Sequence, residues 1–112
     1  MIAMLKQPGT APVRIDIEAG TENLCRVLGG EMEHVGFGMG IGVLCDEEGR
    51  YKGPVINGKP TSLPYNFRLD SYISFVGTVL FVGEGKEDFI DSTEEQIEII
   101  SDFFKKKRRH LK

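Results

Sequence analysis

The chain has 112 residues, of which 40% are hydrophobic and 28% charged, and a net charge of −3, as expected for one globular domain. This composition excludes a disordered chain, and no apolar run approaches the ~18 residues that a membrane-spanning helix needs. The first residues lack a secretory-signal pattern, so we expect a cytoplasmic protein with no membrane partner.

The charge is unevenly distributed along the chain. The last eight residues, KKKRRHLK, hold six of the fourteen Lys and Arg residues and no acid. The other eight basic residues stand against seventeen acidic ones, so the body of the chain carries about −9. This charge favours a basic partner for the body and disfavours nucleic acid.

The N-terminal part predicts a hairpin followed by a short helix. Residues 2–7 (IAMLKQ) predict a first strand, and residues 13–18 (VRIDIE) alternate apolar and polar side chains, which is typical of a half-buried antiparallel strand. A Pro-Gly turn between them favours a hairpin. The stretch GTENLCRVLGG then predicts a helix with Thr21 as its cap and Gly29 at its end.

The two cysteines, Cys25 and Cys45, both have apolar neighbours in the sequence. We expect reduced, buried thiols that pack as small hydrophobic groups. Neither has a visible relation to His34 or His110, and no Cys/His cluster has the spacing of a metal site.

Residues 36–42, GFGMGIG, place a glycine at every second position. In one straight strand they would leave a bare face that could receive a ring or a second sheet. We prefer a hairpin that turns through Gly38, Met39 and Gly40 and joins strands over 31–37 and 40–47. A phosphate-binding loop is disfavoured, because a strand follows rather than a helix.

The second half of the chain predicts turns, one loop and one long strand. Residues 46–49 mark an acidic turn, and Asn57-Gly58 is typical of a type I′ turn. Residues 59–68 predict a surface loop. The apolar run 71–84 predicts one central strand, bent at Gly77.

The last element is a helix that opens in DSTEEQ, where either Ser92 with Glu95 or Thr93 with Gln96 forms a capping box. An apolar stripe along this helix indicates that it docks on the sheet. We therefore expect an α+β fold, a mostly antiparallel sheet with two helices packed on one side. Residues 1–104 form a single domain, and residues 105–112 are a basic helix end or tail.

Three stretches carry a resemblance to a known family: LGGEMEHV, CDEEGRYKG, and VGTVLFVGE followed by DSTEEQ. With them, residues 1–104 resemble a family of small proteins of unknown function, a domain of unknown function, encoded by phages, plasmids and conjugative elements. The resemblance implies a protein of a mobile element and supplies no catalytic residues. The glycines around residues 37–42 and the basic end depart from the family pattern.

Our first hypothesis is a non-catalytic binding protein that antagonises host defence, in the manner of an anti-CRISPR protein. It would bind a host protein or nuclease complex through acidic side chains, and a glycine-rich edge strand would pair two copies into a homodimer. The acidic residues are Glu31, Glu33, Asp46, Glu47, Glu48, Glu84, Glu87 and Asp88.

Two alternatives stay open. A small-molecule binder, such as a sponge for a nucleotide signal, would use Gly38, Gly40, Arg50, Tyr51, Lys52 and Asn57. A nucleic-acid binder would use Lys105, Lys106, Lys107, Arg108 and Arg109. We expect no enzyme, cofactor or metal site, because neither a nucleophile–base pair nor a metal-ligand set is visible.

Overall fold

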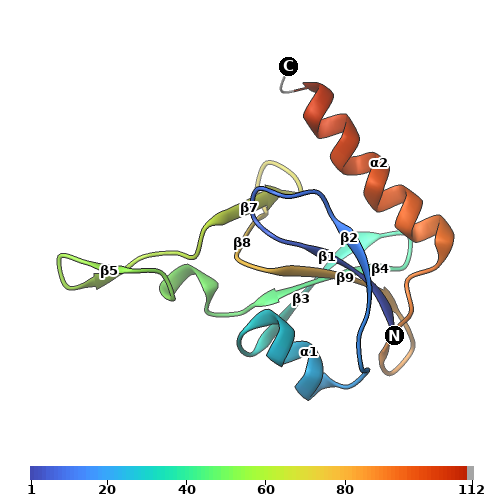
Figure 1. Ribbon diagram of the computed structural model, residues 1–112, viewed down its shortest axis with the longest axis horizontal. Coiled ribbons are helices and arrows are strands. Elements are labelled where there is room, and N and C mark those ends of the chain that lie inside the picture. Colours follow the sequence, from blue (N-terminus) through green and yellow to red (C-terminus); the bar gives the residue numbers. More distant parts are fainter. Residues whose placement is uncertain (111–112) are drawn as a thin grey trace.

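The computed structural model describes residues 1–110 and has the expected α+β architecture, with one main antiparallel sheet and two α-helices (Figure 1). The main sheet has six strands in the order β2-β1-β9-β4-β3, with β10 added on β9. Its strands are β1 Ile2–Lys6, β2 Val13–Asp16, β3 Met32–Gly38, β4 Ile41–Asp46, β9 Val79–Glu84 and β10 Phe89–Ile90.

Strand β9 is central, as the sequence predicted for this apolar run, and it pairs with β1 on one side and β4 on the other. Successive side chains of β9 alternate between the two faces of the sheet. Phe81 joins one apolar cluster, whereas Leu80 and Val82 join another. Both faces of the sheet are therefore covered, which explains why residues 79–82 of β9 are all apolar.

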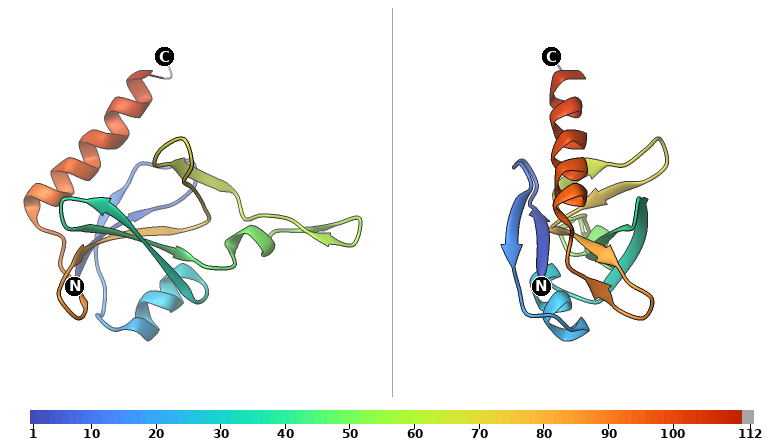
Figure 2. Two further views of the ribbon diagram at one scale, coloured as in Figure 1. Left: turned by 180° about the vertical axis from the view of Figure 1, so that it is seen from behind. Right: turned by 90° about the vertical axis from the view of Figure 1, so that its right-hand side faces the viewer.

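The two helices cover opposite faces of the sheet, and the expectation that they share one side is wrong. Helix α1 (Thr21–Leu28) buries Leu24 and Leu28 in the cluster around Leu80. Helix α2 (Glu94–His110) contributes Ile100 to the cluster around Phe81. Figure 2 shows this separation from two further sides, with the C-terminal half of α2 extending past the sheet. Neither helix, over the described residues, is long and apolar enough to cross a bilayer.

The helix ends follow the sequence signals in part. Thr21 is the first residue of α1 and not its cap, because Gly20 takes the cap position with φ 112°, and no side chain caps the helix. Gly29 ends α1 in the left-handed conformation, as predicted. At α2, Thr93 and Gln96 form the reciprocal capping box, with N···O distances of 3.0 and 3.1 Å.

The glycine stretch forms the preferred hairpin. Strands β3 and β4 are joined through Gly38, Met39 and Gly40, all with positive φ. The alternative of one straight strand is therefore wrong. Strand β3 lies at the edge of the sheet.

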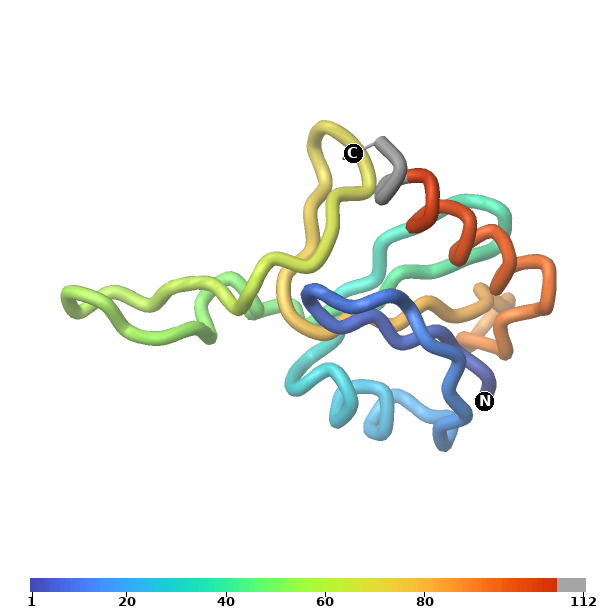
Figure 3. Tube along the Cα trace, turned by 45° about the horizontal axis from the view of Figure 1, so that its top comes forward, coloured from blue at the N-terminus to red at the C-terminus, as the bar shows by residue number. Residues whose placement is uncertain are grey.

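Residues 53–62 form an arm that extends from the body (Figure 3). Strands β5 (Val55–Ile56) and β6 (Lys59–Pro60) pair in it, and positive φ at Asn57 and Gly58 confirms the predicted turn. Before the arm, the acidic turn leads into a short 3-10 helix, Gly49–Tyr51.

Two expectations for the second half are wrong. Residues 59–68 are not one loop, since they contain β6 and β7 (Tyr65–Arg68). Residues 71–84 are not one strand, because Gly77, with φ 70°, separates β8 (Ser74–Val76) from β9. Strands β7 and β8 form a separate small sheet, in which the rings of Phe67 and Phe75 stack at 4.8 Å. The basic end is helical through His110, and residues 111–112 lie outside the described residues.

Candidate functional site

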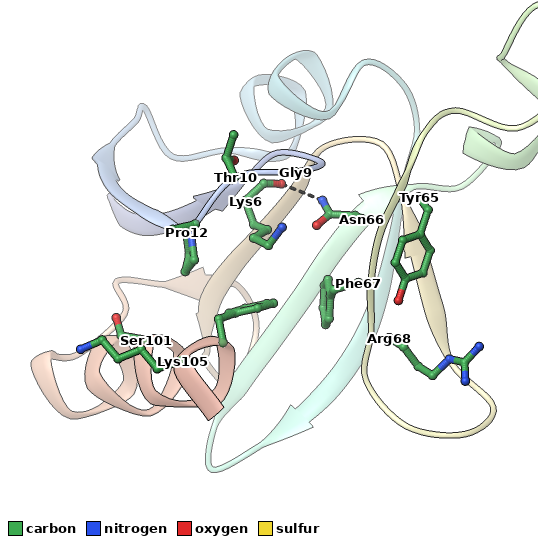
Figure 4. Close-up of a pocket in the computed structure, with 12 residues that line it drawn as sticks. Lys6, Gly9, Thr10, Pro12, Tyr65, Asn66, Phe67, Arg68, Ser101 and Lys105 are labelled. Atoms are coloured by element: carbon green, nitrogen blue, oxygen red, sulfur yellow. Dashed lines mark hydrogen bonds between the residues drawn. The ribbon is translucent and has the colours of Figure 1, made fainter. Parts of the chain in front are cut away.

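A cavity of about 430 Å³ opens where the β1–β2 turn, strand β7 and helix α2 meet (Figure 4). We call it the Lys6 cavity. Its volume falls in the range of ~300–1,000 Å³ that is usual for small-molecule sites. It is lined by Lys6, Gly9, Thr10, Ala11, Pro12, Tyr65, Asn66, Phe67, Arg68, Ser101, Phe104 and Lys105.

Aromatic rings form the apolar wall of the Lys6 cavity. Phe67 of β7 is 4% exposed and meets Phe104 of α2 edge to face, with ring centroids 5.1 Å apart. Phe67 also contacts Phe75 and Phe81 in the core. The sequence places Phe67 and Phe104 here because β7 and α2 both turn apolar positions toward the same face of the sheet. The wall is therefore continuous with the core and held in place by it.

Lys6 brings a positive charge into this apolar surrounding. It is the last residue of β1 and is only 6% exposed. Its Nζ donates to the carbonyl oxygen of Gln7 at 3.0 Å and lies 5.4 Å from the centroid of the Phe104 ring. An ammonium group held in such a place by a carbonyl and a ring face interacts more strongly with an anion than an exposed lysine does.

Asn66 fixes the inner end of the cavity. Its Nδ2 donates to the carbonyl oxygens of Lys6 at 2.8 Å and Gly77 at 2.7 Å, and so ties β7 to the end of β1 and to the bend before β9. Its Oδ1 is buried and has no hydrogen-bond partner within the described residues. Figure 4 shows this oxygen on the side of the cavity that holds the Lys6 amine.

The charge of the Lys6 cavity is opposite to that of the chain. Arg68 and Lys105 add two cations on opposite sides of it, and none of its described lining residues carries a carboxylate. The whole chain, by contrast, has a net charge of −3. The cavity is therefore a positive, partly apolar site in an acidic protein, and it suits an organic anion.

A second cavity, of about 180 Å³, lies beside Cys45 and is lined by Glu33, Glu47, Arg50 and Tyr72, among others. Burial, with Glu33 and Asp46 nearby, raises the pKa of Cys45 to about 11. A thiol with this pKa stays protonated near neutral pH and is a poor nucleophile. Both cysteines are free, as expected, although Cys25 is only half-buried.

No group of three or more His, Cys, Asp or Glu side chains in the described part of the chain is arranged to hold a metal ion.

The structure divides the predicted acidic surface. Glu31, Glu33, Glu47 and Glu48 are exposed near one end of β3 and β4, where the Glu47 N–H donates to the Glu31 carbonyl at 2.8 Å. Glu84, Glu87 and Asp88 lie at the other end, around the β9–β10 turn. The length of β9 separates the groups by about 17 Å at roughly 3.3 Å per residue.

Two of the acidic residues have partners within the fold. Asp46 is 5% exposed and accepts from Lys52 Nζ at 2.8 Å and from the Glu48 N–H at 2.9 Å. The hydrogen bond to Asp46 raises the pKa of Lys52. Glu84 pairs with His34. Asp46 is thus a structural group rather than part of an open surface.

The residues predicted for a ligand site are not brought together. Gly38 and Gly40 lie at the β3–β4 turn, and Arg50, Tyr51 and Lys52 lie at the opposite end of these strands. Asn57 is at the tip of the arm. Arg50 donates to the Ser74 carbonyl at 2.8 Å, and Lys52 is held by Asp46.

Of the residues predicted for nucleic acid, Lys105 lines the Lys6 cavity and Lys106 is exposed. The side chains of Lys107, Arg108 and Arg109 lie outside the described part of the structure.

Sequence reasoning missed most of the Lys6 cavity, including Lys6, Asn66 and Phe104. One signal was present: Lys6 is a charged residue that ends an otherwise apolar strand, and Asn66 stands between two aromatic residues of another. A polar side chain at a buried position of a strand normally has a hydrogen-bond partner.

No curated protein and no solved structure shows a significant match to this chain. A family model does match it, over residues 1–105, which is nearly the whole chain. The match begins just before β1 and ends within α2, so it includes every described strand and helix α1. The chain therefore belongs to the family described as a domain of unknown function (DUF3846).

Proposed function

We propose that this protein binds a small organic anion in the Lys6 cavity and does no chemistry on it. The observation that carries the proposal is the buried Lys6 ammonium beside an aromatic wall, in a cavity of about 430 Å³ whose described lining residues include no carboxylate. Small-molecule binding was one of the alternatives from the sequence. The proposal moves the binding site from the glycine turn, residues 50–52 and Asn57 to the cavity between β1, β7 and α2.

The charges and the aromatic wall of the Lys6 cavity both support the binding of an anion there. A ligand anion next to Lys6 would be shielded from water by Phe67 and Phe104, which strengthens the attraction. Arg68 and Lys105 would draw anions toward the opening, and this contribution should weaken as salt is added.

Binding is tested by a thermal-shift screen of inorganic phosphate, mononucleotides and aromatic carboxylates, followed by calorimetry. A ligand at 100 times its dissociation constant should stabilise the fold by about 2.7 kcal/mol. Lys6→Met keeps the length of the side chain and removes the charge, so it should weaken binding at least about tenfold. Lys59→Met, on the exposed arm, is the matched control and should bind as the wild type does.

The proposal fails if no anion in the screen raises the melting temperature. It also fails if Lys6→Met, folded by circular dichroism, binds the same anion as tightly as Lys59→Met.

A second candidate function is the defence antagonist of a phage or plasmid, acting in the cytoplasm. It is supported by the exposed carboxylates of Glu31, Glu33, Glu47 and Glu48, which lie together at the edge strand β3 and the turn after β4. They would bind a basic surface of a host protein or nuclease complex. The free edge of β3 could at the same time pair two copies of this chain.

This candidate is tested by pull-down from host lysate at low salt. Changing the four glutamates to glutamine should release the partner. The matched control changes Glu18, Glu95, Glu98 and Asp102, four exposed acids outside the predicted surface, to their amides. Equal retention of a partner by both variants would count against the acidic edge, and sedimentation at several concentrations would decide on the dimer.

A further inference from the structure

We infer that the ligand of the Lys6 cavity is a mononucleotide whose base donates an N–H hydrogen bond to Asn66 Oδ1. This inference rests on the proposed function and narrows it to one class of anion. It comes from the hydrogen bonds of Asn66, which none of the sequence patterns had marked.

The orientation of the Asn66 amide is fixed by its neighbours. An amide nitrogen carries two hydrogens, and both are used, on the Lys6 carbonyl at 2.8 Å and the Gly77 carbonyl at 2.7 Å. Turning the amide over would place its oxygen against two carbonyl oxygens. The atom on the cavity side is therefore the oxygen (Figure 4).

This oxygen can only accept a hydrogen bond. It belongs to a side chain that is 7% exposed, and it has no partner within the described residues. Leaving such an acceptor unpaired destabilises a fold, so a donor from outside the chain is expected at this point. A ligand group that fills the place must therefore carry an N–H or O–H.

The side chains around Asn66 favour a ligand in which a flat aromatic ring carries this hydrogen-bond donor. Phe67, next to Asn66 in β7, and Phe104 of α2 meet at 76° and form the wall of the same cavity. Tyr65, two residues from Phe67, adds a ring that is 59% exposed at the opening. Aromatic side chains stack on heterocyclic bases and tolerate any of them.

The charged part of the ligand then lies toward the lysines. Lys6 stands on one side of Asn66, and Lys105 of α2 lies farther out on the helix side of the cavity (Figure 4). A phosphate attached to the base through a sugar would extend from the ring wall toward these amines. An anionic group, a flat ring and an amino N–H attached to that ring are found together in a mononucleotide with an amino-bearing base.

The test compares ligands that differ only in the donor. AMP is paired with the purine ribonucleoside 5′-phosphate that has hydrogen in place of the 6-amino group. CMP is paired with its analogue lacking the 4-amino group. Calorimetry on the full chain should show at least one amino nucleotide binding about tenfold more tightly than its partner, with ribose 5-phosphate weaker than both.

The outcomes separate the inference from the proposed function. If each pair binds equally, a water molecule satisfies Asn66 and the inference is overturned, while anion binding stands. If only inorganic phosphate or aromatic carboxylates bind, the inference is again overturned. If no anion binds at all, both proposals fall.

Side-chain amide signals in ¹⁵N spectra give a second readout that requires no substitution. On addition of the amino nucleotide, the Asn66 Nδ2 signals should shift, because its Oδ1 gains a donor. Asn23 and Asn57 lie outside the lining of the Lys6 cavity, so their signals should stay in place. An Asn66 signal that moves equally with the analogue lacking the amino group would contradict the inference.

Discussion

His34 of β3 and Glu84 of β9 meet across the intervening strand β4, with Nε2 and Oε2 2.6 Å apart. They can do so because Gly42 of β4 lies beneath them. A Cβ atom at Gly42 would be 2.9 Å from His34 Nε2 and 3.2 Å from Glu84 Cγ. The ring of Phe89 packs edge to face on His34, with centroids at 5.0 Å. The bare face of this glycine is thus filled by side chains of the same chain.

Gly42→Ala should separate His34 from Glu84 at little cost in stability. The obstructing atoms belong to side chains that can move, the lost hydrogen bond is partly exposed, and alanine is easier to order than glycine. We expect the free energy of unfolding to change by less than about 1 kcal/mol. Chemical denaturation measures the change, and loss of the His34–Phe89 contact in NMR spectra reports the displacement.

Gly83→Ala is the contrasting substitution on the neighbouring strand. Its Cβ would lie 2.6 Å from the Asp91 carbonyl oxygen, which belongs to the backbone and cannot turn away. We expect a loss of about 1–3 kcal/mol, as for an overpacked core position. If Gly83→Ala were as stable as Gly42→Ala, the backbone around Asp91 would be able to shift away from the added Cβ atom, and the predicted loss of stability would be wrong.

Asn66 should be needed for stability as well as for the proposed ligand. Asn66→Ala leaves the carbonyls of Lys6 and Gly77 without their buried donor, which should cost about 2 kcal/mol or more. Asn66→Asp has nearly the same shape but cannot donate when ionised, so it should cost at least as much. The midpoints of urea unfolding give both values, and an aspartate variant as stable as the wild type would contradict this role.

Gln96 should contribute more to the stability of the fold than its neighbours at the start of α2. Besides its part in the capping box, its Nε2 donates to the carbonyls of Met39 and Gly40 at 3.1 and 3.0 Å and so fastens the helix to the β3–β4 turn. Gln96→Ala should lose about 1–2 kcal/mol. Glu95→Ala, the matched control one residue earlier, should lose little, because Glu95 is exposed. A similar loss in both variants would contradict this role of the Gln96 hydrogen bonds, because alanine raises helix propensity at either position.

The features predicted correctly are those fixed by a few adjacent residues. Positive φ is easily adopted by glycine, so the turns at Gly38–Gly40 and Asn57–Gly58 follow from local composition. The Thr93–Gln96 capping box is equally local. The apolar run of β9 also held a signal for two covered faces, because it lacks the alternation of a half-exposed strand.

The features missed depend on contacts between distant residues. The separation of β8 from β9 follows from Gly77, where a Cβ would lie 2.8 Å from Leu63 Cδ1, and from Phe67 stacking on Phe75. Lys6, Asn66 and Phe104 come from three distant parts of the chain. No local pattern relates them, so the Lys6 cavity could be found only from the fold.

Cys45 should react with thiol reagents far more slowly than Cys25. Cys45 is 8% exposed, and burial raises its pKa to about 11, so almost none of it is thiolate at pH 8. The variants Cys25→Ala and Cys45→Ala each leave one thiol, and its rate of reaction with a chromogenic disulfide is measured at pH 8. If Cys45 reacted as fast as Cys25, the prediction would be wrong, and the reagent would reach the Cys45 thiol through a local opening of β4.

The raised pKa of Cys45 also predicts a loss of stability in alkali. The unfolded thiol loses its proton near its ordinary pKa of 9.0, whereas the folded one keeps it until about 11. Above pH 9 the unfolded state therefore binds fewer protons than the folded state, so the free energy of unfolding falls as pH rises from 9 to 11. The contribution is fully present below pH 9. Urea unfolding of the wild type and of Cys45→Ala between pH 9 and 11 isolates the contribution of Cys45, because the alanine variant lacks the titrating thiol. If the free energies of unfolding of the two proteins changed in parallel with pH, the raised pKa of Cys45 would be refuted.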